Sequence, residues 1–304
     1  MKTKNNADIK INLEKIQKQK PIKELLNFSI INIDKPTGPT SFDIDLEVKK
    51  ALNLNKTSHF GTLDPIVTGV LPVALGRACR LMNYFIGHKK EYIGIMHLHK
   101  DISETELKKE MNKFIGKINQ LPPVKSRVKR QIRQRQVYNF EVLEFDKNNK
   151  DALFKSEVEA GTYIRKLISD LGEAIGGAHM TELRRTRASV FEEKDSINLY
   201  KFLEAVNQYK KGNETKLREI LIPGEIISKI LPVIEINDKN YIEKLFHGAP
   251  LFKEKVEDAK NKDFILNDKI AIFNKNEFIG IFNIISEGQI LAKPEFVMQP
   301  IAKN

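Results

Sequence analysis

The sequence predicts an α+β fold divided into two domains. Its 304 residues are enough for a full hydrophobic core and exceed the usual size of a single domain. Over residues 28–222, strand-like stretches alternate with stretches of helical periodicity, whereas short strands dominate beyond residue 230. Residues 213–224, which include Pro223-Gly224, have the composition of a passage between the two domains.

The first domain follows a polar, lysine-rich arm at residues 1–27, which we expect to be loosely ordered. Ser41 is expected to cap a helix that continues to about Leu52. Ser103 begins a capping-box pattern for a helix that ends at Gly116. The remaining predicted strands are 28–34, 70–75, 90–99, 137–145, 153–159 and 179–190, and the remaining predicted helices are 77–86, 162–175 and 197–209.

The second domain is predicted to be a small β unit with one helix. Its predicted strands are 230–236, 269–273, 277–285 and 290–293, and its predicted helix is 239–246. We find no internal repeat in the chain.

Composition limits the function classes. A net charge of +11 and a pI near 9.4 favour an acidic partner, with nucleic acid ahead of an anionic membrane. Cys79 is the single cysteine, so no internal disulfide can form and a reducing compartment is expected. The N-terminal residues lack the apolar core of a secretory signal, and no apolar stretch is long enough to cross a bilayer. Almost all arginines fall between Arg77 and Arg187, which indicates positions that need a planar, forked cation.

One carboxylate is set in an unusual loop, the run Gly-Thr-Leu-Asp-Pro at residues 61–65. The proline fixes its own backbone angle and biases Asp64 towards extended geometry. Gly61 and Gly69 permit tight turns or a close approach of another backbone. These features predict a rigid loop that presents Asp64 and is anchored by the apolar strand 70–75. The alternative is a turn closed by an Asx-type hydrogen bond.

With a glycine four residues after the proline, this run resembles the catalytic motif of the TruB-type pseudouridine synthases. Asp-Lys-Pro-Thr-Gly-Pro-Thr-Ser at 34–41 resembles the same family's first motif. Gly-Ala-His-Met-Thr-Glu-Leu-Arg-Arg-Thr-Arg at 177–187 and His-Leu-His at 97–99 are similar to the dyskerin branch, the RNA-guided H/ACA enzymes of archaea and eukaryotes. The similarity covers roughly residues 28–300, with the motifs in the family's order.

The resemblance implies a catalytic domain at 28–222 with a mixed, mainly antiparallel sheet. It also implies a small β-barrel RNA-binding domain of the PUA type at 230–304, because Leu-Phe-His-Gly-Ala-Pro-Leu at 245–251 is similar to the PUA signature. The arm at 1–27 is expected to pack beside the PUA domain. The residues of this signature that we expect to contact RNA are His247, Gly248 and Pro250.

The reaction implied by the resemblance breaks the glycosidic bond of a uridine, turns the base and reattaches it through carbon. Asp64 is expected to be the catalytic carboxylate, charged in a dry cleft and acting as nucleophile or as proton acceptor. Tyr92 matches the family's active-site tyrosine, which stacks on the base and serves in proton transfer. Arg165 matches the arginine that pairs with the carboxylate, keeps it ionised and fixes its rotamer.

The resemblance assigns Lys35, His59 and Leu183 to the substrate. His59 is expected to fill the space left by a flipped nucleotide, and the alternative is that it only supports the loop. Leu183 is expected to line the pocket, although from its sequence context alone it is a plain core residue. Phe60 departs from the small residue usual in the dyskerin branch, and we expect its bulk to reshape the pocket mouth.

Residues 122–135 contain many cations and no acid. Such a run is usually a solvated surface, but it repels itself unless a polyanion is near, so we expect it to clamp RNA phosphates. Arg185 and Arg187 alternate along a predicted strand, which places them on one face as further candidates. The candidate RNA-binding cations are Lys125, Arg127, Lys129, Arg130, Arg133, Arg135, Arg185 and Arg187.

His97 and His99 have a spacing found in some metal sites, but no third ligand is evident, so we interpret them as structural. The chemistry implied by the resemblance needs no metal and no other cofactor.

The leading hypothesis is an RNA pseudouridine synthase that modifies rRNA or tRNA as the catalytic subunit of an H/ACA guide ribonucleoprotein. The resemblance implies as partners a guide RNA, a small zinc-ribbon protein, a short β-barrel protein and a kink-turn-binding protein. An alternative is a stand-alone synthase for the T-loop of tRNA, and another is an RNA-binding scaffold without catalysis. Because the chain ends soon after the PUA-like strands, we expect an archaeal cytoplasmic protein, or a nucleolar one if the source is eukaryotic.

Overall fold

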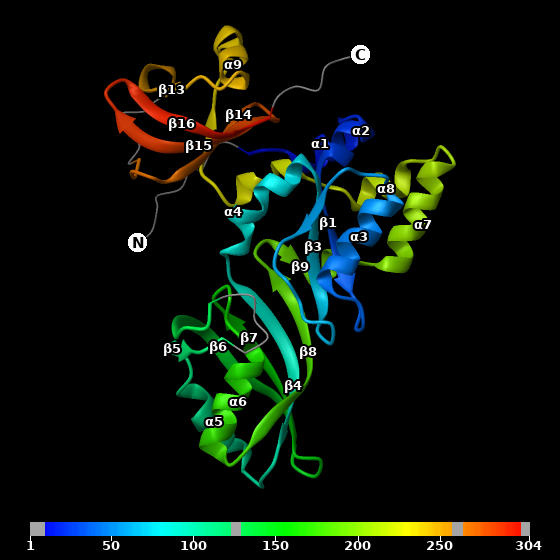
Figure 1. Cartoon of the computed structure of the whole chain (residues 1–304), viewed down its shortest axis with the longest axis vertical. Coiled ribbons are helices and arrows are strands. Elements are labelled where there is room, and N and C mark those ends of the chain that lie inside the picture. The colour runs from blue at the N-terminus through cyan, green and yellow to red at the C-terminus, as the bar shows by residue number, and fades with distance from the viewer. Residues whose placement is uncertain (1–9, 123–128, 257–263, 299–304) are drawn as a thin grey trace.

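Two β-sheets organise the chain, which is seen here as a computed structural model that describes residues 10–122, 129–256 and 264–298. Figure 1 shows a long sheet with helices along it and a second, smaller sheet at one end. The α+β class and the mixed, mainly antiparallel sheet predicted from the sequence are confirmed.

The first sheet has the order β10-β1-β3-β8-β4-β7-β6-β5, with β11 added to β1, β2 to β3 and β9 to β8. The pairs β1–β10 and β3–β8 are parallel, and the other pairs are antiparallel. Its strands are β1 (Phe28–Lys35), β2 (Thr57–His59), β3 (Thr68–Gly76), β4 (Lys90–Leu98), β5 (Gly116–Gln120), β6 (Arg133–Asp146), β7 (Asp151–Val158), β8 (Ala178–Ala188), β9 (Phe191–Glu192), β10 (Ile197–Asn198) and β11 (Ile222–Pro223).

Helices flank both halves of this sheet. In Figure 1, α5 and α6 lie beside the β4–β7 half, and α3 and α7 lie beside β1 and β3. The helices of this part are α1 (Leu13–Gln19), α2 (Ile22–Asn27), α3 (Ser41–Ala51), α4 (Met82–Ile86), α5 (Glu104–Asn112), α6 (Ile164–Ile175), α7 (Leu199–Lys210) and α8 (Thr215–Ile220), and the 3-10 turns are η1 (Arg77–Leu81), η2 (Glu193–Asp195) and η3 (Gly224–Lys229).

Helix α6 forms as its sequence predicts. Ile164, Leu167, Ile168 and Leu171 recur at helical spacing and are all buried. Gly176 ends the helix with a left-handed φ of 87°, which glycine adopts without steric cost.

Helix α3 begins one residue earlier than predicted. Thr40, not Ser41, is the cap: its side chain accepts from the Asp43 N–H while the Asp43 carboxylate accepts from the Thr40 N–H. Ser41 is buried and makes other contacts, described below. The helix predicted to end at Gly116 ends at Asn112, and Gly116 begins β5 instead.

The predicted passage at 213–224 belongs to the first domain. It contains α8, and Leu217 and Leu221 are buried in the core of the first sheet. Its last residues form β11, in which Ile222 and Pro223 pair with β1. Because Ile222 and Pro223 still pair with β1, the chain leaves the first sheet only after Pro223.

The second sheet has the order β12-β14-β15-β16-β13, with β12 parallel to β14. One face of α9 packs on it through Tyr241, Ile242 and Leu245. The elements are β12 (Val233–Glu235), α9 (Lys239–Phe246), β13 (Leu251–Phe252), η4 (Lys253–Lys255), β14 (Lys269–Asn274), β15 (Glu277–Glu287) and β16 (Ile290–Val297).

The two sheets share a hydrophobic core. The rings of Phe28 on β1 and Phe278 on β15 stack with centroids 5.3 Å apart. Tyr84 after η1 donates from its hydroxyl to Glu295 Oε1 at 2.8 Å. These contacts hold the second sheet against the end of the first.

The arm before β1 bridges both parts. Gln17 on α1 donates from Nε2 to the carbonyl of Leu221 at 3.0 Å. The Asn12 N–H donates to Asn276 Oδ1 in the turn between β14 and β15 at 2.9 Å. Among the described residues of the arm, therefore, contacts reach the second sheet and the first.

Candidate active site

The loop that carries Asp64 rests on a buried cation. Lys35 is fully buried, and its Nζ donates to the carbonyls of Pro36, Pro65 and Val67 at 2.9, 3.0 and 2.9 Å. Burial lowers the pKa of the Lys35 ammonium, and the charge of Asp64 opposes that shift. The structure contradicts the prediction that Lys35 contacts substrate, because the three donors of its ammonium are used inside the protein.

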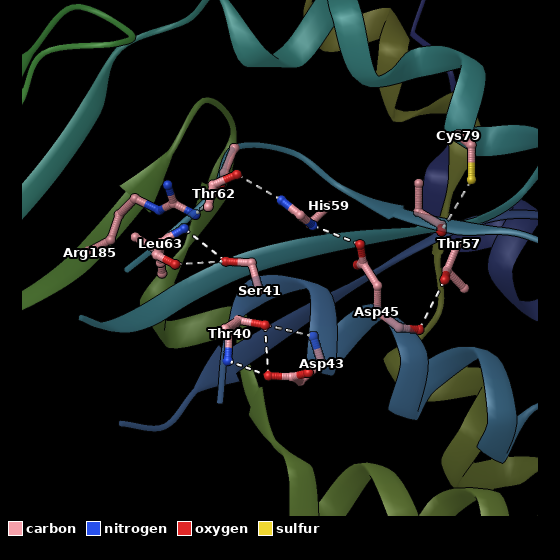
Figure 2. A network of polar contacts seen from close by, with 12 residues as sticks. Thr40, Ser41, Asp43, Asp45, Thr57, His59, Thr62, Leu63, Cys79 and Arg185 are labelled. Atoms are coloured by element: carbon pink, nitrogen blue, oxygen red, sulfur yellow. Dashed lines mark hydrogen bonds and ion pairs between the residues drawn. The ribbon is translucent and has the colours of Figure 1, made fainter. Parts of the chain in front are cut away.

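Residues of the segment 34–41, which resembles the family's first motif, contact the same loop from a second side. Ser41 Oγ donates to the Leu63 carbonyl at 3.0 Å and accepts from the Leu63 N–H at 2.8 Å (Figure 2). The Gly38 N–H donates to the carbonyl of Pro65 at 2.9 Å. The residues on both sides of Asp64, Leu63 and Pro65, are thus held by hydrogen bonds to their backbone groups.

Asp64 itself is open to solution. Its Oδ2 accepts from Arg165 Nη2 at 2.7 Å, and the side chains of Asp64 and Arg165 are 57% and 53% exposed. The expectation that the carboxylate lies in a dry cleft is therefore wrong for the free chain. The structure does bring Asp64 and Arg165 together, although 101 residues separate them in sequence.

The side chains of Gln120 and Arg135 fix the start of α6, in which Arg165 is the second residue. The Tyr163 N–H donates to Gln120 Oε1 at 3.0 Å, and Gln120 Nε2 donates to the Tyr163 carbonyl at 3.2 Å. Arg135 Nε donates to the carbonyl of Gly161 at 3.2 Å. Arg135, which the sequence placed in the cationic segment, thus helps to position the helix that presents Arg165.

Arg185 lies beneath the loop. It is 1% exposed, and its Nε and Nη2 donate to the carbonyls of Val70 and Gly61 at 2.8 and 2.9 Å. Burial lowers the pKa of this guanidinium, and the charge interaction with Tyr92 and a hydrogen bond that the guanidinium donates to the Tyr92 side chain oppose the shift. The prediction that Arg185 contacts RNA is wrong, because the guanidinium is inaccessible and supports the loop.

A β-bulge explains why Arg185 and Arg187 do not share a face. On β4, the adjacent residues Glu91 and Tyr92 pair with Arg187 and Arg185, so β8 carries one extra residue there. Arg187 is therefore on the face of Glu91, and its Nη2 lies 3.6 Å from Glu91 and 3.3 Å from Glu157 carboxylate oxygens. A regular alternation could not reveal this bulge.

Tyr92 and Leu183 lie on the same part of the sheet. Tyr92 is partly buried and packs against the core cluster that contains Leu183. Leu183 is 8% exposed and pairs with Gly94. Tyr92 is connected to the loop through Arg185, which bonds both Tyr92 and Gly61.

His59 is held at both ring nitrogens. Nδ1 lies 2.7 Å from Asp45 Oδ2 and Nε2 lies 3.0 Å from Thr62 Oγ1 (Figure 2). Phe60, the next residue, is 2% exposed and stacks on Phe85 with centroids 5.0 Å apart. The expectation that Phe60 reshapes the pocket mouth is wrong, because its ring enters the core shared by the two sheets.

The remaining cations of the segment differ in exposure. Lys125 and Arg127 lie outside the described residues. Lys129 and Arg130 are exposed, and Arg133 at the start of β6 is partly buried.

The turn after α9 contains the residues expected to contact RNA in the second domain. His247 and Gly248 are exposed, and Gly248 has a φ of 90° with open space where a Cβ would be. Pro250 is partly buried, and its carbonyl accepts from the Tyr241 hydroxyl at 2.7 Å.

The histidines at the far end of β4 meet a third. His97 Nδ1 lies 2.8 Å from Asp151 Oδ1, and His99 Nε2 lies 2.9 Å from His179 Nδ1. Sequence reasoning missed His179, which only the β4–β8 register brings near. Within the part of the chain that the structure describes, no group of side chains is arranged to hold a metal ion.

Sequence reasoning also missed Lys90 and Asp45. Lys90 is 6% exposed and donates to the carbonyls of Ile86 and His88 at 2.5 and 2.6 Å. Burial, and then the charge of Arg185, lower its pKa to about 8. The signal for Asp45 was its position four residues after Ser41, on the same face of a helix.

Comparisons with known proteins give the family. The profile of the TruB family pseudouridylate synthase N-terminal domain matches residues 49–164, and that of the tRNA pseudouridylate synthase B C-terminal domain matches residues 165–228. No helix of the described residues has the length and apolar character needed to span a membrane.

Relatives cover most of the chain. The probable tRNA pseudouridine synthase B of Methanocaldococcus jannaschii is 44% identical over 77% of this chain and 69% of its own, and that of Thermococcus kodakarensis is 41% identical over 94% and 85%. A chain in the crystal structure of a Cbf5-Nop10-Gar1 complex matches 98% of this chain and 92% of its own, with a TM-score of 0.84 and 37% identity. A chain in the structure of an H/ACA RNP bound to a substrate RNA containing 2′-deoxyuridine matches the same shares, with a TM-score of 0.83 and 36% identity. The chain therefore belongs to the TruB family and is a pseudouridine synthase, an isomerase that acts on RNA.

Proposed function

We propose that Asp64 is the catalytic carboxylate and that it acts on a uridine turned out of its RNA strand. One observation carries this proposal: a carboxylate projects, more than half exposed, from a loop whose backbone is fixed by Lys35 and Ser41. A charged group that is held in place yet reachable from solution can meet a ribose without reorganising.

The reaction is an isomerisation. The bond between C1′ and N1 breaks, the base turns, and C1′ bonds to C5; the proton lost from C5 balances the proton gained by N1. Asp64 either attacks as a nucleophile or removes a proton, and both roles start from its ionised form. Arg165 supports that form, and a nucleotide that covers the pair would exclude water and strengthen their attraction.

Tyr92 would stack on the turned-out base and assist proton transfer. Arg185 bonds both the Tyr92 side chain and the Gly61 carbonyl, so it holds the tyrosine hydroxyl close to the loop that carries Asp64. His59 would face the substrate strand from the other end of the loop, and Leu183 would close the floor behind Tyr92.

The cationic segment would clamp RNA phosphates. Arg135 contacts Gly161 just before α6, so this end of the segment lies next to the start of the helix that carries Arg165. Lys129 and Arg130 are exposed there, and Arg133, Lys125 and Arg127 belong to the same segment. Arg187 would contribute only if RNA displaced its contacts with Glu91 and Glu157.

The second sheet would be a PUA domain that binds a guide RNA through His247, Gly248 and Pro250. Similarity over 98% of the chain to proteins solved in H/ACA complexes supports this, because the match includes both sheets. The enzyme would then modify rRNA or tRNA, with a zinc-ribbon protein, a short β-barrel protein and a kink-turn-binding protein as partners, and we place it in an archaeal cytoplasm. The names of the sequence relatives favour a second candidate function, a stand-alone pseudouridine synthase that modifies the T-loop of tRNA.

The test is product formation by the pure protein on a tRNA transcript and on an RNA paired to an H/ACA guide. On the guide proposal, pseudouridine forms at the guided uridine only when guide RNA and accessory proteins are present. Full activity on tRNA without them would replace it by the stand-alone function. No product on either RNA under any condition would contradict both.

A further inference from the structure

Helix α3 holds the catalytic loop at two points on one face. Ser41 contacts Leu63 through two hydrogen bonds, and Asp45, one turn further along, reaches Thr62 through the ring of His59. Figure 2 shows the chain of contacts from Asp45 to His59 to Thr62 beside the Ser41 contact. Thr62 and Leu63 directly precede Asp64, so the two contacts hold the residues next to the one that carries the carboxylate.

We propose that Asp45 is a positioning residue of this enzyme: it fixes the tautomer and orientation of the His59 ring, and through it the position of Thr62 and Asp64. This inference rests on the proposed role of Asp64.

The geometry determines which ring nitrogen bears the proton. An ionised carboxylate only accepts hydrogen bonds, so a 2.7 Å contact between Asp45 Oδ2 and His59 Nδ1 requires a proton on Nδ1. Nε2 is then directed at the Thr62 hydroxyl at 3.0 Å, as acceptor in the neutral ring or as donor in the charged ring. In either form the ring is locked between helix and loop.

Asp45 is itself firmly placed. It is 7% exposed, and its carbonyl accepts from Thr57 Oγ1 at 3.0 Å, which ties α3 to β2, the strand that ends at His59. Its other carboxylate oxygen is buried and has no hydrogen-bond partner among the described residues. The hydrogen bond between His59 Nδ1 and the buried Asp45 carboxylate is therefore strong and directional. Without the His59 ring, the buried charge of Asp45 would have no compensation.

The order of carboxylate, imidazole and hydroxyl resembles the Asp-His-Ser triad of enzymes that use a serine nucleophile. Here the hydroxyl of Thr62 supports the loop and is not a nucleophile. Thr62 would transmit the orientation of the ring through the two peptide bonds that connect it to Asp64. A small displacement of a reacting group lowers the rate of the chemical step far more than it weakens binding. Loss of Asp45 should therefore lower kcat and leave KM nearly unchanged.

The test compares Asp45→Asn, which keeps the shape and removes the charge, with Thr62→Val and with Glu47→Gln, an exposed carboxylate on the same helix. Nitrogen NMR of the imidazoles reads the tautomer, and His59→Gln identifies the His59 signals among the six histidines. Wild type should show the proton on Nδ1. Asp45→Asn should move it towards Nε2, whereas Thr62→Val and Glu47→Gln should not.

Activity and loop order supply the other readouts. Asp45→Asn and Thr62→Val should each lower kcat about tenfold with KM changed less than about twofold. The double variant should be no slower than the slower single one, since both break one chain. Exchange of the Leu63 amide hydrogen should be about tenfold faster in Asp45→Asn.

An unchanged tautomer in Asp45→Asn, or a changed tautomer with wild-type kcat and Leu63 exchange, would overturn the proposal. So would an equal loss in Glu47→Gln. If Asp45→Asn does not fold, wild-type kcat in Thr62→Val overturns it. If wild type forms no pseudouridine on any RNA, the proposed function fails, while the tautomer and the Leu63 exchange still decide whether Asp45 positions the loop.

Discussion

Lys35, Lys90 and Arg185 are buried cations that lie behind the loop that carries Asp64. Each donates to backbone carbonyls, which recovers part of the free energy lost when a charge leaves water. The side chain that Gly61 lacks would meet Arg185 and Lys90, so these two cations lie directly behind the loop. Their charges attract an approaching phosphate backbone.

Replacing Lys90 should change how stability depends on pH. Its pKa falls from 10.5 to about 8 on folding, so between these values the unfolded chain binds more protons than the folded one. Stability contributed by Lys90 therefore rises as the pH increases from 8 to 10.5, by about 3 kcal/mol at most.

Urea unfolding of wild type and Lys90→Met at several pH values between 7 and 10.5 measures this. The free energy of unfolding of wild type should gain on that of the variant across this range. If the free energies of unfolding of wild type and variant change with pH in parallel, folding does not shift the pKa of Lys90.

The parallel pairing of β3 with β8 joins the two halves of the first sheet next to the loop that carries Asp64. Gly69 pairs there with Arg185, has a φ of 99°, and a Cβ on it would lie 2.2 Å from the Arg185 carbonyl oxygen. Only glycine permits this approach, so Gly69, the second residue of β3, allows the two backbones to pair and Arg185 to reach beneath the loop.

Gly69→Ala should lower the free energy of unfolding by about 3 kcal/mol or more, because strain at a left-handed φ adds to a backbone clash. Gly212→Ala is the matched control: it has a φ of 93° with nothing within 4 Å of its Cβ position, and should cost about 1 kcal/mol. Thermal or urea unfolding compares them. Equal losses in the two variants would mean that β3 and β8 can separate without cost.

Long elements with many buried apolar residues could be predicted from the sequence, and short ones could not. Strands β1 and β3 are mainly apolar runs that are buried on both faces, and helix α6 shows its buried residues at helical spacing. Two-residue strands such as β10 and β11 have no period at all, and they exist because β1 offers unpaired backbone groups. This is why the segment around β11 was mistaken for a connection.

The site was predictable where motif and chemistry coincide. The pairing of Arg165 with Asp64 could be anticipated because each residue matches a residue of the family whose partner in the site is known, although the two lie in separate parts of the sequence. The burial of Lys35 and Arg185 could not, since a cation is normally exposed and only the three-dimensional structure shows the carbonyls that surround it. The direction of the Phe60 ring also depends on Phe85, which lies in another element.

In the molecule as a whole, the proposed RNA contacts and the proposed chemistry lie on different parts of the chain. RNA contacts are proposed over the cationic segment and the second sheet, whereas the proposed catalytic carboxylate is a single residue on a loop with its own supports. The shared core around Phe28 and Phe278 keeps the second sheet fixed relative to that loop. Removing the charge of Asp64 should therefore leave RNA affinity intact.

The most direct measurement is pseudouridine formation by Asp64→Asn under the conditions in which wild type is active, together with its affinity for the same RNA. Asparagine keeps the size of the side chain and cannot act as a nucleophile or accept the proton. We predict unchanged affinity and no detectable product. Product at a rate near that of wild type would contradict the assignment of catalysis to Asp64.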